Sequence, residues 1–318
     1  MGLSNGSSLV AIAAKNNFNR NNFEKAWRLL DVLEFVDSDP FLRDRLALKG
    51  GTAINLTIFD NPRLSGDLDF DFSENCDPAD LLSTRNNVLA VINPFMISKG
   101  YEPEEAFRRS HSLDSVHYYY SNIGGGKDLI KLDINYSDRC HILPLERRKC
   151  KVNWDERGLE VLSVHTIEIF ATKISALLTR SAARDLYDVV NLKKSGIFDS
   201  SDLELLNRCV AFYMALSGDF HGGNYHYGNM DKLTQADIRK FIVPMIRGNE
   251  FFELAEGKKQ AREYLDSFLK ITPEVRAFFD AFLSGKYKPE LLFPEDGIGK
   301  KLLAHPMALW RIKEYQRW

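Results

Sequence analysis

Charged and apolar residues alternate strictly over residues 67–72 of this chain. Three aspartates take every second position, Asp67, Asp69 and Asp71, and apolar residues fill the positions between them. Because side chains alternate between the two faces of a strand, this pattern predicts a strand with three carboxylates on one face. Like charges on one face repel each other, and a divalent cation bound by carboxylate oxygens would relieve that repulsion.

A glycine-rich turn precedes this strand. Gly50 and Gly51 allow a tight turn and close approach of the backbone to a ligand, and the apolar run that follows predicts a helix beginning near Thr52. Free N–H groups at a helix N-terminus favour an anion such as a triphosphate. The stretch from Leu48 to Ser73 therefore predicts a phosphate cradle followed by a metal-binding strand. The alternative is a glycine-rich connection with a solvated strand face.

The hydrophobic pattern changes from mixed elements to helices along the chain. Helices are predicted over residues 23–36, 41–48 and 77–97. Strands are predicted over residues 115–122, 128–137 and 159–164, with a turn at the triple glycine 124–126. From residue 165 onward the pattern is helical, beginning with residues 165–179 and 181–194. We therefore expect an α+β fold, with a mixed sheet and helices in residues 1–160 and a helical domain in residues 161–318.

A further carboxylate lies on one of the later predicted strands. Asp133 faces away from the apolar side of residues 128–137. We expect this strand to join the sheet that carries Asp67 and Asp69, so Asp133 is a candidate third metal ligand. Asp71 competes for that role because it shares the face of Asp67, and the plain alternative for Asp133 is an exposed strand residue.

Basic residues follow one another through the first helices of the helical half. Lys173 lies inside an apolar helix, and Arg180 and Arg184 follow at spacings that place all three on one face if the helix continues. Such a stripe would neutralise a triphosphate in the transition state. The alternative is a surface stripe with an Arg184–Asp188 pair that contributes only about a few tenths of a kcal/mol.

Two other basic segments are candidates for nucleic-acid contact. The first is residues 139–151, and the second is the C-terminal segment, where Lys300, Lys301 and Lys313 accompany Trp310. Basic residues interleaved with aromatic ones suit phosphate neutralisation and base stacking. The alternatives are a solvated loop for the first segment and an ordinary amphipathic helix with a buried Trp310 for the second.

The composition narrows the class of protein. The chain has 318 residues, 44% of them hydrophobic and 27% charged, which indicates a globular protein with room for two domains. Its net charge of −2 limits nucleic-acid binding to local patches. No apolar run approaches the length of about 18 residues that spans a membrane, and the N-terminus lacks a signal-peptide pattern. The four cysteines are not spaced as zinc ligands, so we expect reduced thiols and a cytoplasmic protein.

Residues 48–191 resemble the nucleotidyltransferase superfamily and, within it, the AbiEii/MenT toxins of type IV toxin–antitoxin pairs. The resemblance rests on four stretches, Gly50-Gly51-Thr52, Arg63-Leu64-Ser65-Gly66-Asp67-Leu68-Asp69-Phe70, Lys173 and Arg184-Asp185-Leu186-Tyr187-Asp188. In the superfamily at large the second turn residue is usually a serine. Its hydroxyl role would therefore fall here to Thr52 or to the backbone.

The resemblance implies functions for these residues. Asp67 and Asp69 would hold two Mg²⁺ ions, and Asp133 would complete one of the two sites. The turn Gly50-Gly51-Thr52 would cradle the triphosphate, and Lys173 would contact the incoming nucleotide, with Arg184 nearby in the family block. Ser65 would position the phosphates or become modified. One aspartate of the later block is needed for activity in the family, which is Asp185 or, alternatively, Asp188.

The resemblance also implies substrates and partners. The expected enzyme transfers a nucleotide from a nucleoside triphosphate to an acceptor with release of pyrophosphate. The expected acceptor is the 3′ end of tRNA, whose modification blocks translation, and the expected protein partner is a cognate antitoxin. One alternative is transfer to a small molecule or a protein. Another is a non-catalytic module that binds a nucleotide or a partner, but the intact carboxylates argue against it.

Overall fold

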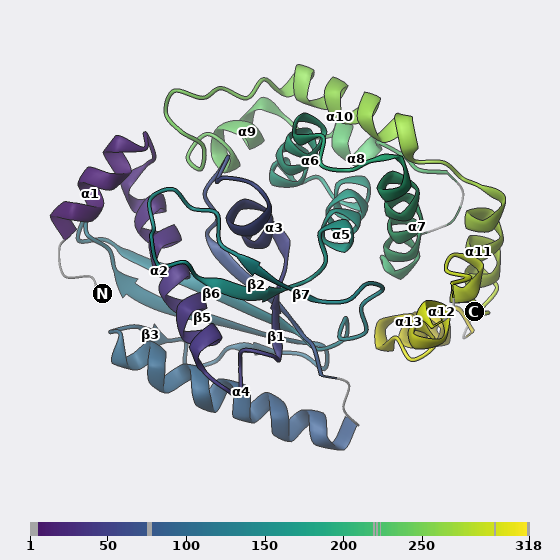
Figure 1. The fold of residues 1–318 in the computed structure, drawn as a ribbon, viewed down its shortest axis with the longest axis horizontal. Helices are drawn as coiled ribbons and strands as arrows, with labels where there is room; N and C mark the ends of the chain where they lie inside the picture. Colours follow the sequence, from purple (N-terminus) through teal and green to yellow (C-terminus); the bar gives the residue numbers. More distant parts are fainter. Residues whose placement is uncertain are drawn as a thin grey trace. The chain divides into compact units, whose positions relative to one another are not determined.

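The computed structural model describes residues 6–74, 78–218, 220, 222, 224–295 and 297–316 (Figure 1). The chain forms two compact units, and neither is continuous in sequence. Unit 1 consists of Met1–Arg139, Leu145–Ser163 and Pro244–Glu250. Unit 2 consists of Cys140–Pro144, Val164–Val243 and Phe251–Trp318.

Unit 1 is built around one mixed sheet. Its strands are β1 (Leu46–Leu48), β2 (Asp67–Phe72), β3 (Glu102–Pro103), β4 (Arg108–Arg109), β5 (Leu113–Ser121), β6 (Lys127–Asn135), β7 (Glu146–Lys149) and β8 (Glu160–Ser163). The strand order is β3-β5-β6-β2-β1-β8-β7, and β4 pairs with β5. Strand β2 lies in the middle of the sheet, parallel to β6 and antiparallel to β1.

The alternating segment forms the strand that its pattern predicts. Leu68, Phe70 and Phe72 are at most 1% exposed and form part of the core, whereas the aspartates lie on the opposite face. The helix predicted over residues 41–48 is wrong, because residues 41–45 form turns and the last three residues form a strand. Leu46–Leu48 forms β1 because it pairs with β2, with Leu48 opposite Phe70, and all three of its residues are buried.

The helices of unit 1 pack beside this sheet. They are α1 (Gly6–Lys15), α2 (Arg20–Ser38), α3 (Gly50–Ala53), the π-helix η1 (Ile54–Ile58) and α4 (Pro78–Ser98). The predicted helix over residues 23–36 is confirmed as part of α2. Figure 1 shows α4 running along the sheet, and the stacked rings of Phe35 and Phe95, 3.9 Å apart, join α2 to α4. Pro94 lies inside α4 and does not end it, and Asp77, the first residue of the helix predicted over residues 77–97, lies outside the described residues.

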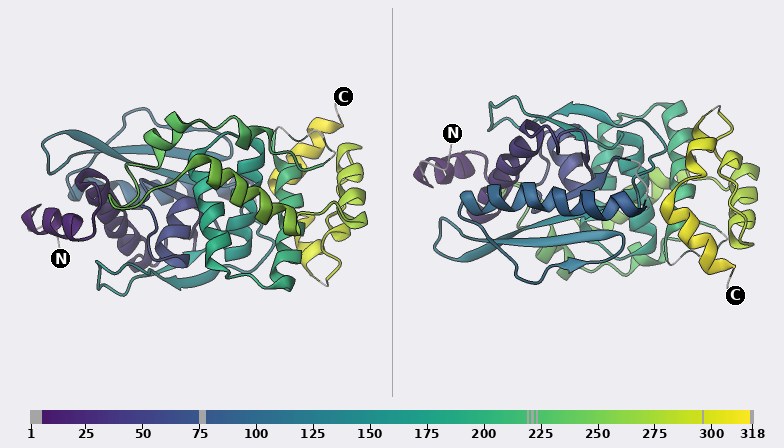
Figure 2. Two further views of the ribbon diagram at one scale, coloured as in Figure 1. Left: turned by 90° about the horizontal axis from the view of Figure 1, so that it is seen from above. Right: turned by 90° about the horizontal axis from the view of Figure 1, so that it is seen from below.

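Unit 2 is helical in the residues that the structure describes. Its helices are α5 (Thr166–Thr179), α6 (Ala183–Ser195), α7 (Ser200–Leu216), α8 (Gly228–Asp231), α9 (Gln235–Phe241), α10 (Leu254–Phe268), α11 (Pro273–Leu283), the 3-10 helix η2 (Pro289–Leu291), α12 (Ile298–Leu302) and α13 (Pro306–Tyr315). Helix α5 packs against α6, α7 and α8 and so forms the centre of this unit. These four helices are coloured teal to green in Figure 2. The side chain of His165 caps α5 by accepting a hydrogen bond from the Ile167 N–H group.

A buried carboxylate explains why residues 140–144 belong to unit 2. Glu168 on α5 accepts hydrogen bonds from the N–H groups of Ile142 and Leu143, at 3.1 and 3.0 Å, and from the Tyr213 hydroxyl. Burial alone would raise the pKa of Glu168, but His141 and Tyr213 lower it below its usual range. The ionised carboxylate therefore fixes this short segment to the helical core.

None of the helices within the described ranges combines the length and apolar character needed to cross a lipid bilayer. Cys140, Cys150 and Cys209 form no disulfide bond with one another, and the Cys140 thiol lies 3.3 Å from the Lys301 carbonyl oxygen.

Candidate active site

The sheet register brings carboxylates from two strands together in unit 1. On the parallel pair β2 and β6, Asp69 is the register partner of Asp133, and Asp67 is the partner of Lys131. Partners on neighbouring strands present their side chains on the same face of the sheet. The structure therefore places Asp133 beside Asp69, on the face that also carries Asp67.

Two lysines accompany these carboxylates, and sequence reasoning did not single out either of them. The Lys131 Nζ atom lies 2.5 Å from Asp133 Oδ2, and the Ser115 hydroxyl donates to Asp133 Oδ1 at 2.6 Å. Lys49 forms an ion pair with Asp71, and its Nζ atom lies 3.7 Å from Asp138. The only sequence signals were a lysine directly before the glycine turn and another two residues before Asp133.

The charge of Lys49 is stabilised by its surroundings. Burial would lower the pKa of this amine, but Asp71, Asp138 and Asp69 together raise it well above its usual range. Asp71, which competed with Asp133 as a third metal ligand, is 4% exposed and is bound by this lysine. The lysine pairs therefore balance part of the negative charge on this face of the sheet.

The residues present fit a magnesium site that substrate helps to complete. Among the described residues, no group of three or more His, Cys, Asp or Glu side chains is arranged to hold a metal ion. Mg²⁺ needs only one or two protein carboxylates when substrate phosphates and water supply the other oxygens. Asp67 and Asp69 provide two carboxylates on one strand face, and Asp133 can join them once Lys131 moves away.

Gly50 allows the turn to approach Asp69 closely. Its φ of +68° lies in the left-handed region, and a Cβ atom built on it would meet Asp69 Oδ2 at 2.8 Å. The Lys49 N–H group also donates to the Asp69 carbonyl at 2.9 Å. The helix expected near Thr52 begins two residues earlier, at Gly50. The backbone of this turn thus lies directly against the carboxylate strand.

Buried polar side chains fix the turn to the start of β2. The Thr52 hydroxyl donates to the Asp67 carbonyl at 2.5 Å, so the Ser65 hydroxyl, 2.6 Å from it, donates to Thr52. Arg63 is 1% exposed, and a Cβ atom on Gly51 would lie 2.5 Å from its guanidinium. Thr52, Ser65 and Arg63 are all buried, so in this structure they hold the turn in place.

Unit 2 contains a second charged cluster, centred on Lys173. Its Nζ atom lies 2.8 Å from Asp185 and 3.2 Å from Asp188, and both carboxylates are 1% exposed. Arg180 adds a contact at 2.9 Å to Asp185. Burial would raise the pKa of Asp185, but Lys173 and Arg180 lower it below its usual range. Asp185 is therefore ionised and held by two cations.

A shared cationic face of Lys173, Arg180 and Arg184 would require one continuous helix, which the chain does not form here. Helix α5 ends at Thr179, and Arg180 adopts an extended conformation with φ −140° and ψ 156°. Helix α6 starts at Ala183, and Arg184 lies half-exposed in its first turn. The break between the helices turns Lys173 and Arg180 toward the same carboxylate instead of along one helical stripe.

The two basic segments differ in their exposed charge. In residues 139–151, Arg147 pairs with Asp37 and lies 3.5 Å from Asp44, and Arg148 pairs with Glu146. Part of this segment forms strand β7. In α13, Trp310 is 42% exposed, and the guanidinium of Arg311 lies 5.1 Å from its ring centre and pairs with Glu314 at 2.6 Å. The alternative of a buried Trp310 is therefore wrong.

Comparisons with known proteins show the family and the fold of this chain. The family described as nucleotidyl transferase AbiEii toxin, type IV toxin–antitoxin system, matches residues 32–284. The structure is similar to that of MenT4, a nucleotidyltransferase toxin from Mycobacterium tuberculosis H37Rv, with a TM-score of 0.59 and 16% sequence identity. The match covers 98% of this chain and 97% of that chain, which confirms the predicted α+β nucleotidyltransferase fold. Among curated proteins, none matches the sequence significantly.

Proposed function

The chain belongs to the AbiEii family of nucleotidyltransferase toxins of type IV toxin–antitoxin systems, and we propose that it modifies the 3′ end of tRNA and so blocks translation. Membership identifies an enzyme that transfers nucleotides, and it implies a nucleoside triphosphate substrate and an antitoxin partner. The observation that carries the proposal is the alignment of Asp69 with Asp133 on parallel strands, with the Gly50 turn against Asp69.

The proposed reaction is an in-line displacement at the α-phosphorus. A hydroxyl oxygen of the acceptor forms a bond to this phosphorus, and the bond to the bridging oxygen of the β-phosphate breaks. The hydroxyl proton passes to water, and pyrophosphate leaves with the electron pair of the broken bond. Bound Mg²⁺ would neutralise the developing charge on the attacking and leaving oxygens. Asp67, Asp69 and Asp133 would hold that ion, with two ions expected from the family resemblance.

The remaining residues of the proposal bind and orient the triphosphate. The backbone at Gly50, Gly51 and Thr52 would face the phosphates, and the buried bonds of Thr52 with Ser65 and Asp67 hold that backbone in position. Lys173 and Arg184 would contribute positive charge to the nucleotide, with Asp185 orienting Lys173. In this proposal residues 1–160 supply the carboxylates and residues 161–318 supply Lys173 and Asp185.

The setting of the proposed reaction is the cytoplasm, where triphosphates and tRNA are both present. The expected partner that neutralises the protein there is its cognate antitoxin.

A labelling experiment tests the reaction and its acceptor together. The protein is incubated with Mg²⁺, total RNA and each α-labelled nucleoside triphosphate in turn, and the labelled species are separated by size. Label on the tRNA fraction, lost after digestion of its 3′ end, is the expected result. Asp69→Asn should remove labelling, and Asp60→Asn, at an exposed aspartate, is the matched control. Label on the protein itself or on a small molecule would reject tRNA as the acceptor.

A further inference from the structure

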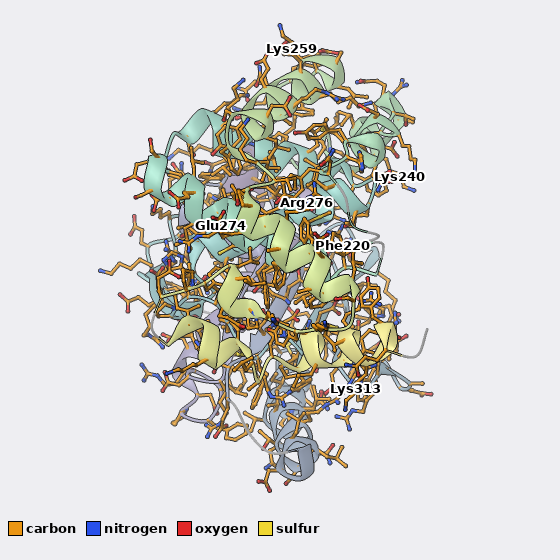
Figure 3. The ribbon with its side chains drawn as sticks, turned by 90° about the vertical axis from the view of Figure 1, so that its right-hand side faces the viewer. Phe220, Lys240, Lys259, Glu274, Arg276 and Lys313 are labelled. Carbon is orange, nitrogen blue, oxygen red and sulfur yellow. The ribbon has the colours of Figure 1, made fainter. Side chains whose placement is uncertain are left out.

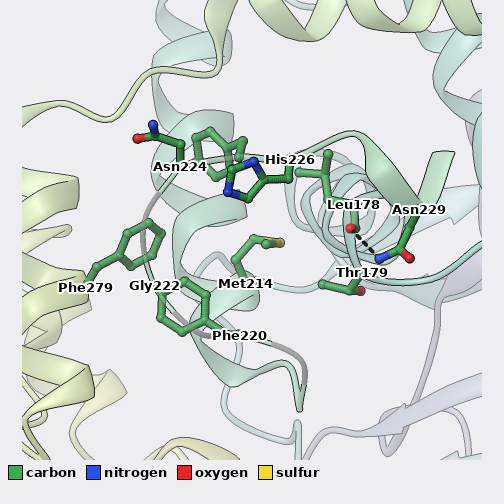
Figure 4. Close-up of a pocket in the computed structure, with 10 residues that line it drawn as sticks. Leu178, Thr179, Met214, Phe220, Gly222, Asn224, His226, Asn229 and Phe279 are labelled. Carbon is green, nitrogen blue, oxygen red and sulfur yellow. Dashed lines mark hydrogen bonds between the residues drawn. The ribbon is translucent and has the colours of Figure 1, made fainter. Parts of the chain in front are cut away.

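A cavity lies in unit 2 beside the last turn of α5. Its volume is about 290 Å³, and its walls come from α5, α7, α11, Phe220, Gly222 and residues 224–229 (Figure 4). Pockets for drug-sized ligands have volumes of about 300–1,000 Å³. This cavity therefore has room for one compact ring system and excludes a larger ligand from its interior.

The floor of the cavity suits a flat aromatic ring. Met214, Phe220 and Phe279 line it, and each is at most 9% exposed. Aromatic rings and a methionine sulfur make favourable contacts with the face or edge of another ring. Exposed aromatic side chains stack on bases that have left a helix, and His226 is an exposed ring among the lining residues (Figure 4). A ring entering the cavity would thus meet apolar atoms below and an imidazole above.

The rim of the cavity carries amide groups. Asn224 is exposed, and its Oδ1 accepts a hydrogen bond from Arg276 at 3.2 Å; Figure 3 labels Arg276 and Phe220 on this side of the unit. Asn229 donates to the Leu178 carbonyl at 3.1 Å and accepts from Lys232 at 2.9 Å. These contacts orient both amides, and an oriented amide can read the donor and acceptor pattern of a base edge.

A cationic side chain, that of Arg180, follows directly after the cavity wall in the α5–α6 turn. Thr179 lines the cavity and is followed directly by Arg180, whose side chain is 63% exposed and contacts Asp185. The Ser181 hydroxyl in the same turn donates to the Asn229 carbonyl at 2.8 Å. A ligand with a ring at one end and phosphate at the other matches an apolar cavity with a neighbouring guanidinium.

From these observations we propose that the cavity binds the nucleobase of a nucleotide ligand. This inference rests on the proposed function, because nucleotides are the substrates of that reaction. The base belongs either to the incoming triphosphate or to the terminal nucleotide of the acceptor, and both present the same chemistry. Occupation of the cavity would then set the preference of the enzyme among bases.

Methyl NMR of Met214 tests the proposal directly. The methionines are labelled with ¹³C at the methyl group, and Met214→Leu assigns the resonance of the cavity floor. One titration uses each nucleoside triphosphate, and a second uses an RNA oligonucleotide with a free 3′ hydroxyl. A saturable shift of the Met214 resonance in either titration is the expected result, and the titration that produces it identifies the source of the base. No shift with either ligand overturns the proposal.

Two variants separate cavity binding from a remote effect. Thr179→Trp fills the cavity and should abolish the shift, and the other methionine resonances report whether the variant is folded. His226→Ala changes an exposed rim residue and should weaken binding about tenfold, the loss expected for one stacking contact. His111→Ala, at an exposed histidine of unit 1, is the matched control. Unchanged affinity in His226→Ala together with a full shift in Thr179→Trp would contradict a base in this cavity.

The outcome is distinguishable from failure of the proposed function. Nucleotide transfer by wild-type protein with an unmoved Met214 resonance rejects the cavity and leaves the reaction standing. A saturable Met214 shift without any transfer to RNA supports the cavity and rejects tRNA modification.

Discussion

Asp69 is the residue on which the proposed chemistry depends most. Its register partner is Asp133, its carboxylate lies against the Gly50 turn, and its strand is fixed by a buried apolar face. Asp69→Asn keeps the shape of the side chain but removes its charge. We expect nucleotide transfer to fall by at least about a thousandfold, as for loss of a group that stabilises developing charge, with an unchanged circular dichroism spectrum. Near wild-type transfer by folded Asp69→Asn would show that the active site is elsewhere.

Lys131 should compete with a metal ion for Asp133. Its Nζ atom lies 2.5 Å from the carboxylate, so a divalent cation that binds there must displace it. We expect Lys131→Met to increase affinity for Mn²⁺ by about two- to fivefold, the scale of a partly exposed ion pair, in calorimetric titrations without nucleotide. Lys127→Met, on the same strand and paired with Glu102, is the control. Equal Mn²⁺ affinity in both variants would show that Asp133 is not a ligand of the bound metal ion.

Lys173 should stabilise unit 2 as well as serve the nucleotide. It is 9% exposed between Asp185 and Asp188, and removing one partner from a buried pair costs about 3–5 kcal/mol. We expect Lys173→Met to lower the free energy of unfolding by about that amount at neutral pH. Urea unfolding followed by circular dichroism measures this, and a loss below about 1 kcal/mol would indicate a surface-like lysine.

The pH dependence of this loss has a defined sign. In the wild type the pKa of Asp185 is lowered, so its stabilising contribution is complete above the ordinary carboxyl pKa and is lost as pH falls through the lowered value. Lys173→Met removes the largest contribution that lowers the pKa of Asp185, while Arg180 still contacts this carboxylate, so the pKa moves back toward its ordinary value. The difference between the two proteins should therefore shrink as pH falls below the ordinary carboxyl pKa of about 4. A constant difference would show that charge is not the cause.

Sequence reasoning reached the carboxylates but not their partners. Asp67, Asp69 and Asp133 follow from alternation, which is a local pattern. Lys131 pairs with Asp133, and Lys49 pairs with Asp71. These pairs depend on strand register and on the path of the turn, and neither can be predicted from a single sequence. Arg63 belongs to a recognisable block, but its burial under Gly51 is a result of tertiary packing.

At the scale of elements, the turn between β1 and α3 sets the position of the carboxylate strand. Gly50→Ala would force a side chain into the left-handed region and against Asp69. Gly125→Ala is a matched control, since Gly125 has φ +80° and no atom within 4 Å of an added Cβ. Both variants should lose about 1–2 kcal/mol of stability from backbone strain. Only Gly50→Ala should also lose nucleotide transfer; equal transfer in the two variants would remove the turn from the active site.

The errors at this scale share one cause. The residues 46–48 were predicted as helix, but they form a strand because β2 offers a pairing partner with buried side chains opposite. The stripe of Lys173, Arg180 and Arg184 assumed one continuous helix. Instead, the two helices predicted over residues 165–179 and 181–194 are confirmed as α5 and α6, and Arg180 in the break between them contacts Asp185. Both outcomes depend on contacts distant in sequence, which override local propensity. The long helix α2 and the strand β2 were predictable because the local sequence of each element contains its whole hydrophobic pattern.

For the whole molecule, the question is which surface attracts RNA when the net charge is −2. Ion pairs with Asp37 and Glu146 neutralise Arg147 and Arg148 in the segment of residues 139–151. Helices α12 and α13 instead expose three lysines, Lys300, Lys301 and Lys313, the last labelled in Figure 3. The exposed Trp310 ring lies on α13 beside the Arg311 guanidinium. Basic charge beside an exposed aromatic ring is the combination that binds single-stranded RNA.

We therefore expect α12 and α13 to carry the larger share of RNA affinity. Lys300→Glu with Lys301→Glu should weaken tRNA binding strongly and reduce the slope of log affinity against log salt by about 0.7–0.9 for each lysine that contacts phosphate. Arg147→Glu with Arg148→Glu is the comparison at the neutralised segment and should change the slope less. Filter binding at several salt concentrations measures both, and nucleotide binding should stay unchanged because neither pair belongs to the proposed triphosphate site.

Induced expression in a bacterium then relates binding to toxicity. Wild type should arrest growth with extended tRNA 3′ ends, Asp67→Ala should do neither, and the Lys300 and Lys301 double variant should be attenuated. Arrest by Asp67→Ala, or arrest by the wild type without altered tRNA ends, would contradict tRNA modification as the cause.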